Sequence, residues 1–229
     1  MVHFERARSG DASDVAIAFV DLVQFTALTD IHGDAVAAEA ATTLSELAVA
    51  LSGPRLRVVK SIGDGVLLEA ETRADGVAAV VGVMEGVHEH GFEARAGVAF
   101  GSVVRRGIDV FGRTVNLASR LSSVADPGMV AMTRAMAFEA SVAGLPVTPL
   151  GSVAIKGMRE SVEAFSTNPC SHGGRWVVDP VCGMRIDAEG AIAMSDVDGR
   201  ELGFCSRTCA DLFASDPHGP TEEDRRPDP

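Results

Sequence analysis

The stretch VAIAFVDLVQFT, residues 15–26, carries the strongest fold signal in this 229-residue chain. Its first six residues are all apolar, which suits a buried β-strand. The run ends at Asp21. A carboxylate at the end of a buried strand can cap a helix, and taken alone Asp21 fits that role better than metal binding. A second carboxylate nearby would favour a metal site instead.

Regular elements follow this strand along the chain. Apolar residues at helical spacing predict helices over 34–51 and 72–89. Segment 55–70 reads as two strands joined by a turn at 63–65, because Asp-Gly is a strong hairpin signal. The other predicted elements are a strand at 93–104, a helix at 113–124, short strands near 128–133 and 147–155 around a helix at 134–142, and a strand at 162–167. This βαββαβ order predicts an α+β fold, a ferredoxin-like sandwich whose mixed sheet carries helices mainly on one face.

Composition limits the classes of partner. The formal charge is −12, from 20 Lys and Arg against 32 Asp and Glu. This balance argues against a nucleic-acid or anionic-membrane surface. No apolar run approaches the ~20 residues that span a bilayer, and the first residues lack the apolar core of a secretory signal. We therefore expect a cytoplasmic protein whose four cysteines are thiols or metal ligands.

Five further polar residues stand out beside Asp21. Asp64 occupies the predicted hairpin turn, where alone it would be an ordinary turn residue, and Lys60 precedes it by four positions. Asn116 and Arg120 are spaced i, i+4, so they share one helix face. With Asp109, these residues could supply two carboxylates for metal ions, a Lys/Asp pair for a base, and an Asn/Arg pair for a charged transition state.

The segments that carry these residues resemble the catalytic domain of class III adenylyl and guanylyl cyclases. They are VAIAFVDLVQFT, VVKSIGDGV (58–66) and GIDVFGRTVNLASRL (107–121), and the resemblance covers about residues 13–166. It implies that Asp21, Leu22 and Asp64 bind two Mg²⁺ or Mn²⁺ ions per active site.

The same resemblance assigns the substrate contacts. Backbone amides of residues 23–26 would cradle phosphate, with Phe25 and Thr26 in the substrate site, and the chain has Gln24 where the family usually has Gly. A Lys and an Asp at the positions of Lys60 and Asp109 select adenine in the family, whereas guanylyl cyclases typically carry Glu and Cys. Lys60 and Asp109 therefore indicate ATP over GTP.

Three more residues complete the implied active site. In the family, the Arg at the position of Arg120 binds the α-phosphate and the Asn at that of Asn116 orients the ribose. Lys156, in VAIKGMRE (153–160), resembles a lysine that reaches the terminal phosphates; an exposed strand-end lysine is the alternative. The implied reaction converts ATP to 3′,5′-cyclic AMP and pyrophosphate.

The resemblance also implies a partner. In the family, one subunit supplies the metal-binding aspartates, and the other supplies the Lys/Asp pair, the Asn and the Arg. This chain carries both halves, so we expect a head-to-tail homodimer with two equivalent sites. A catalytically silent nucleotide-binding or metal-sensing dimer is the alternative.

All four cysteines lie beyond the predicted cyclase domain, at 170, 182, 205 and 209. Residues 167–177 read as a linker, 178–217 as a small module, and 218–229 as a disordered tail. Three thiols in so short a module predict metal binding by Cys182, Cys205 and Cys209. DPVCGM, FCSRTC and Phe213 resemble the YHS domain, although Leu202-Gly203 replaces its usual tyrosine. Structural Zn²⁺ and regulation by Zn, Cu or Fe stay open, as does the fourth ligand. The candidates are Cys170, His172, His218 and Asp187.

Overall fold

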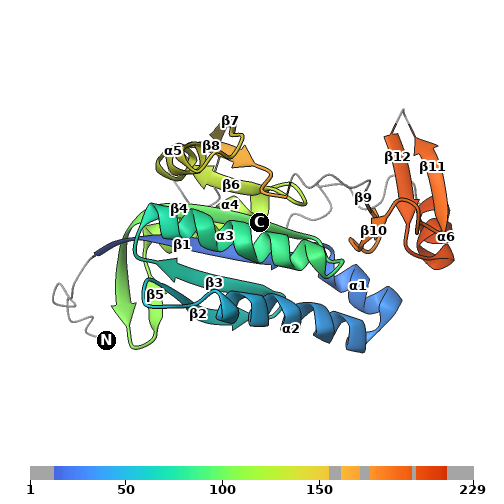
Figure 1. Cartoon of the computed structure of the whole chain (residues 1–229), viewed down its shortest axis with the longest axis horizontal. Coiled ribbons are helices and arrows are strands. Elements are labelled where there is room, and N and C mark those ends of the chain that lie inside the picture. Colours follow the sequence, from blue (N-terminus) through green and yellow to red (C-terminus); the bar gives the residue numbers. More distant parts are fainter. Residues whose placement is uncertain (1–12, 155–160, 171–175, 198–199, 216–229) are drawn as a thin grey trace, which may run out of the picture.

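The computed structural model describes residues 13–154, 161–170, 176–197 and 200–215 (Figure 1). A mixed sheet forms its centre, with the strand order β2-β3-β1-β4-β6-β8-β7 and β5 added to β4. Most neighbours are antiparallel, whereas β4 and β6 run parallel. The strands are β1 (Ser13–Leu22), β2 (Leu56–Ile62), β3 (Gly65–Ala70), β4 (Ala94–Arg106), β5 (Asp109–Phe111), β6 (Val130–Thr133), β7 (Thr148–Val153) and β8 (Val162–Thr167).

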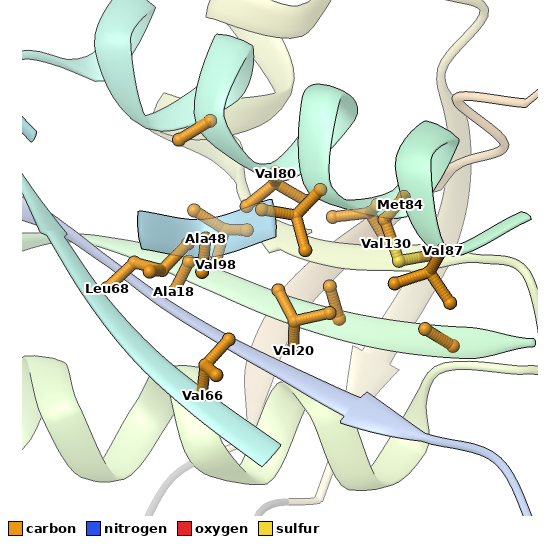
Figure 2. Packing of buried hydrophobic residues seen from close by; sticks show 14 of the residues in the cluster. Ala18, Val20, Ala48, Val66, Leu68, Val80, Met84, Val87, Val98 and Val130 are labelled. Carbon is orange, nitrogen blue, oxygen red and sulfur yellow. The ribbon is translucent and has the colours of Figure 1, made fainter. Parts of the chain in front are cut away.

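Strand β1 lies in the middle of the sheet, and its continuous apolar run is explained by two covered faces. Ala18 and Val20 belong to the core beneath helices α2 (Asp34–Ala50) and α3 (Arg73–Glu89). Figure 2 shows these side chains meeting Val80 and Met84 of α3. The alternate residues Val15 and Ile17 pack on the other face, against helix α4 (Arg113–Val124). Period-2 alternation therefore gives both faces apolar side chains.

The helices of the cyclase domain lie mainly on one face of the sheet, as the sequence predicted, and α4 is the exception. Helices α2, α3 and α5 (Arg134–Val142) share the core on the first face, whereas α4 packs alone on the second. Gly97 of β4 allows this close packing, because a Cβ there would lie 2.1 Å from the backbone nitrogen of Ser122. The mixed α+β sheet itself is confirmed, including the predicted hairpin between β2 and β3.

A short helix, α1 (Phe25–His32), connects β1 to α2. It begins directly after Gln24, the one described residue other than glycine with a positive φ, at 57°. Residues in this left-handed region are uncommon unless they are glycine or asparagine. The sequence did not predict α1 as a separate element. Among the described residues, no helix is both long and apolar enough to cross a membrane.

The C-terminal module lies beside α1 (Figure 1). It contains β9 (Trp176–Val178), β10 (Arg185–Asp187), β11 (Ala193–Val197), β12 (Arg200–Phe204) and α6 (Arg207–Ser215), with β9 paired to β10 and β11 to β12. Its buried apolar cluster is small and centres on Cys182, Phe204 and Cys209. The predicted tail at 218–229 lies outside the described residues.

Candidate active site

The two candidate metal-binding carboxylates meet at one end of the sheet. Asp21 is the next-to-last residue of β1 and pairs in register with Gly65, the first residue of β3. The backbone amide of Leu22 donates to the carbonyl oxygen of Asp64 over 3.0 Å, which fastens the hairpin turn to the end of β1. Gly65 leaves space here, since a Cβ would lie 3.1 Å from Oδ1 of Asp21. Backbone pairing therefore brings together two acids that are 43 residues apart in sequence (64 minus 21).

This pair of acids carries negative charge that the protein compensates only partly. The pKa of Asp21 is raised, chiefly by burial and then by the charge of Asp64. Arg95, which faces Asp21 across the β1–β4 pair, opposes the shift, but its Nη2 lies 3.4 Å from Oδ2 of Asp21. A half-buried pair of carboxylates with a single ion pair among the described residues, to Arg95, suits Mg²⁺ or Mn²⁺, which prefer oxygen ligands. Leu22 can offer such an ion its backbone carbonyl. No local pattern pointed to Arg95, because only the strand register brings it to Asp21.

The loop between β1 and α1 lies next to these acids. Its residues Val23 and Gln24 lead into Phe25 and Thr26, the first two residues of α1. The first amides of a helix have no partner within the helix and can bind anions. The Gln24 side chain turns to the C-terminal module, where Nε2 donates to the carbonyl oxygen of Pro180 over 2.8 Å. The residue that departs from the family's usual glycine thus contacts a part of the chain outside the cyclase domain.

Lys60 and Asp109, the two residues that the sequence analysis assigned to base recognition, form an ion pair in the structure. Nζ of Lys60 lies 2.7 Å from Oδ2 of Asp109. The other oxygen, Oδ1, accepts a hydrogen bond from the amide of Val110 at 2.9 Å. The hydrogen bond from Lys60 is the main reason that the pKa of Asp109 is lowered. A further hydrogen bond holds β5 near β2, because Nη1 of Arg57 donates to the carbonyl oxygen of Ile108 over 2.8 Å.

Asn116 and Arg120 lie on α4, and both are exposed. Among the contacts of the described residues, no hydrogen bond or ion pair involves either side chain. Likewise, among the described residues no hydrogen bond or ion pair joins the two candidate metal-binding acids to the Lys60–Asp109 pair or to the two α4 residues. The single chain therefore presents separate groups of candidate residues instead of one closed site. Lys156 lies outside the described residues.

The three module cysteines converge with a histidine that the sequence analysis missed. The ligand atoms of His32, Cys182, Cys205 and Cys209 all lie within 4.8 Å of one another. His32 ends helix α1 of the cyclase domain, and 173 residues separate it from Cys205. No local spacing signals such a contact.

Two of the four predicted candidates for the fourth ligand, Cys170 and Asp187, do not join this cluster. Cys170 belongs instead to the apolar core, where burial raises its pKa to about 12. Asp187 lies in β10, and its Oδ1 accepts from the amide of Glu189. His172 and His218 lie outside the described residues. Among the described residues, His32 and not Cys170 or Asp187 lies beside the three thiols, which corrects the sequence analysis for these two candidates.

Comparison with known proteins identifies the family. Residues 8–168 match the family described as the adenylate and guanylate cyclase catalytic domain. The chain belongs to this family, because the match covers well over half of it. The predicted domain limits of 13–166 fall inside the matched range.

Relatives with an assigned name agree with this class. An adenylate cyclase of Streptomyces coelicolor is 42% identical over 132 residues, which cover 55% of this chain and 34% of that protein. A pH-sensitive adenylate cyclase of Mycobacterium tuberculosis is 34% identical over 160 residues, covering 67% of this chain and 40% of that protein. The aligned part of this chain thus spans only about a third to two fifths of these relatives.

Solved structures show the same fold. Adenylate cyclases from Trypanosoma brucei, described in their monomeric state, superpose with a TM-score of 0.60 at 22% identity, over 71% of this chain and 93% of that chain. The adenylyl cyclase CyaB from P. aeruginosa gives a TM-score of 0.58 at 20% identity, over 69% of this chain and 94% of that chain. At these identities the likeness concerns the fold alone.

Proposed function

We propose that this protein is an adenylyl cyclase that converts ATP to 3′,5′-cyclic AMP and pyrophosphate at the interface of a homodimer. The observation that carries the proposal is the complete set of candidate residues on a cyclase fold. Two carboxylates meet at the end of β1, a Lys–Asp pair is already formed, and an Asn and an Arg stand exposed on one helix.

The carboxylates would hold the two metal ions. Asp21 and Asp64, with the carbonyl of Leu22, offer oxygen ligands in a place where negative charge is under-compensated. Bound Mg²⁺ or Mn²⁺ would lower the pKa of the ribose 3′-hydroxyl and neutralise triphosphate charge. The neighbouring amides of Gln24, Phe25 and Thr26 would bind phosphate oxygens. The predicted contribution of Val23 is corrected, because its amide already donates to the carbonyl oxygen of Glu93 over 2.9 Å. Arg95 would lose its partial contact with Asp21 when the ions enter.

The Lys60–Asp109 pair supports ATP as the substrate. The lysine can donate to N1 of adenine, and the carboxylate can accept from the exocyclic amine. Guanine has the opposite pattern at this edge, and unpaired polar groups in a binding pocket discriminate strongly against the wrong substrate. The 2.7 Å contact keeps donor and acceptor adjacent before a base binds.

Asn116 and Arg120 would act on the phosphate and ribose of a nucleotide held by the partner subunit. In the reaction, the 3′-hydroxyl loses its proton and its oxygen bonds to the α-phosphorus. The bond from that phosphorus to the bridging oxygen breaks, and pyrophosphate leaves. A planar guanidinium fits the charge that grows on these oxygens. Lys156 is proposed to bind the terminal phosphates.

A head-to-tail homodimer would unite the groups that one chain keeps apart. Twofold symmetry makes two equivalent sites from two copies. Exposed apolar side chains on β4, on β5 and in the turn between them support a protein contact there, with Val104 45%, Ile108 79% and Phe111 50% exposed. The predicted cytoplasmic location belongs to the same proposal, and the four free cysteines agree with a reducing compartment.

The first test measures cyclic-nucleotide formation by the purified full chain. ATP and GTP are each supplied with Mg²⁺ or Mn²⁺, and products are separated by chromatography. We expect cyclic AMP from ATP and little cyclic GMP. Asp21→Asn should reduce the rate about 100-fold or more, because a metal ligand supplies several kcal/mol to the transition state.

Asp14→Asn provides the matched control. Asp14 lies on the same strand but is exposed at its other end, so this variant should keep its activity. Preference for GTP would overturn the assigned base specificity. A folded dimer that binds ATP but forms no product under any condition would indicate the alternative, a silent nucleotide-binding or metal-sensing dimer.

A further inference from the structure

The cysteine cluster has the dimensions of a closed metal site. Sγ of Cys205 lies 3.5 Å from Sγ of Cys182 and 3.6 Å from Sγ of Cys209. It also lies 3.4 Å from Nε2 of His32. A tetrahedral Zn²⁺ ion with ordinary bond lengths would separate two sulfurs by about 3.8 Å, and a sulfur from a nitrogen by about 3.6 Å. The four ligand atoms therefore already surround a space suited to one tetrahedral ion.

Local structure holds the thiols in these positions. Asp179 is fully buried, and its Oδ1 accepts from the amides of Val181 and Cys182. Its Oδ2 accepts from the amide of Cys205 at 2.8 Å, so one carboxylate joins both cysteine loops. Cys209 follows in the first turn of α6, where its amide donates to Oγ of Ser206. These hydrogen bonds come from backbone amides, so they position the cysteines without involving their sulfur atoms.

The fourth side chain comes from the cyclase domain. His32 is the last residue of α1, and Ile31 beside it packs against the module cluster around Cys182. Imidazole nitrogen with three thiolates is a common donor set of structural zinc sites. None of the proposed catalytic steps uses His32. Its approach to Cys205 is thus an unexplained contact between two parts of the chain.

Further contacts join the C-terminal module to the cyclase domain. The amide of Arg185 donates to the carbonyl oxygen of Gly91 over 3.0 Å, and the Arg185 guanidinium contacts Nδ1 of the buried His88. A Cβ on Gly183 would lie 2.8 Å from the carbonyl oxygen of Val23, so the module touches the β1–α1 loop directly. A cavity of about 10 Å³ lies at this boundary, lined by residues of both regions such as Val23 and Gly183. The boundary is therefore a packed interface.

We propose that a zinc site joins the C-terminal module to the cyclase domain. Its ligands are His32, Cys182, Cys205 and Cys209. The site closes a module whose apolar cluster is too small to be stable alone. It also fixes the C-terminal end of α1. The first residues of this helix, Phe25 and Thr26, belong to the proposed phosphate-binding segment. The zinc site stands whether or not the chain cyclises a nucleotide.

The test uses the full chain and Zn²⁺ or Co²⁺ alone as the probe. We expect one zinc per chain by elemental analysis, and X-ray absorption with three sulfur ligands and one nitrogen. Cobalt in its place should give the strong visible bands of a tetrahedral thiolate site. Zinc affinity, measured against a chromophoric chelator, should fall about tenfold or more in His32→Ala, since even outer-shell changes cost 10–100-fold.

Two control variants change a histidine and a cysteine that are not proposed as zinc ligands. His90→Ala changes an exposed histidine on the same domain, and Cys170→Ser changes the thiol outside the cluster; both should keep the affinity and spectrum. Hydrogen exchange at residues 25–32 should slow when zinc is added to the wild type but not to His32→Ala.

Two results would overturn the proposal. One is a folded chain that binds no zinc. The other is a His32→Ala variant, folded by circular dichroism, with unchanged affinity and sulfur–nitrogen ligation. Four-sulfur ligation that vanishes in Cys170→Ser would assign the fourth position to Cys170 and likewise reject His32.

Discussion

The cyclase domain and the C-terminal module differ in what stabilises them. The former buries a large apolar core around α3, with Val83, Met84 and Val87 fully enclosed. Among the described residues, the apolar cluster of the latter encloses Cys182, Phe204 and Cys209, two of which are thiols. Apolar burial accounts for most folding free energy, so the first region can fold by its own packing. The second depends on its contacts with α1 and, in our proposal, on an ion.

The largest effect is expected from a substitution that creates a cavity in the core of the cyclase domain. Leu44 of α2 is 1% exposed, and Leu44→Ala should lower the free energy of unfolding by about 2–5 kcal/mol. Val49→Ala, on the same helix at a side chain 57% exposed, should cost far less. Chemical denaturation would measure both. Zinc affinity should be unchanged, and a parallel loss would mean that the two regions unfold as one unit.

A second variant tests whether catalysis belongs to the cyclase domain alone. Arg120→Ala should lower turnover about 10²–10³-fold, or ~2.7–4 kcal/mol, because a preorganised donor to the transition state is lost. Zinc content should stay the same. Arg113→Ala, an exposed arginine at the start of the same helix, is the control.

Mixing two inactive variants tests whether each active site is formed by two chains. Arg120→Ala keeps the metal-binding half, and Asp21→Asn keeps the other half. Equal amounts, once re-equilibrated, should recover about a quarter of wild-type activity, since half the dimers would have one intact site. No recovery from re-equilibrated dimers would reject the shared site.

The smallest expected effect lies at the boundary between the regions. Gln24→Ala removes the hydrogen bond to Pro180 and should weaken docking of the module by about 1 kcal/mol. Gln24→Gly loses the same bond but adopts the observed φ of 57° easily. Hydrogen exchange in residues 179–187 should rise in both variants, with more disturbance of the β1–α1 loop in the alanine variant. If hydrogen exchange in both variants equals that of the wild type, Gln24 does not help to hold the module on the cyclase domain.

Sequence reasoning succeeded where the signal was local. The apolar run before Asp21 predicted a buried strand, and the Asp-Gly pair predicted the hairpin that carries Asp64. Helical spacing found α2 and α3 to within one residue at each end, and the helix predicted at 113–124 is α4. The cyclase family followed from the same short segments and is confirmed by the match over residues 8–168. The catalytic roles of the individual residues stay predictions.

The sequence by itself determined which side chains are available: two acids at strand and turn ends, an Asn and an Arg on one helix face, and three cysteines in a short module. These depend on neighbours within a few residues. Tertiary structure alone decided that α4 covers the second face, that Arg95 faces Asp21, and that His32 reaches Cys205. Such contacts join segments far apart in the chain, and their partners are chosen by packing and strand register, which no local pattern encodes.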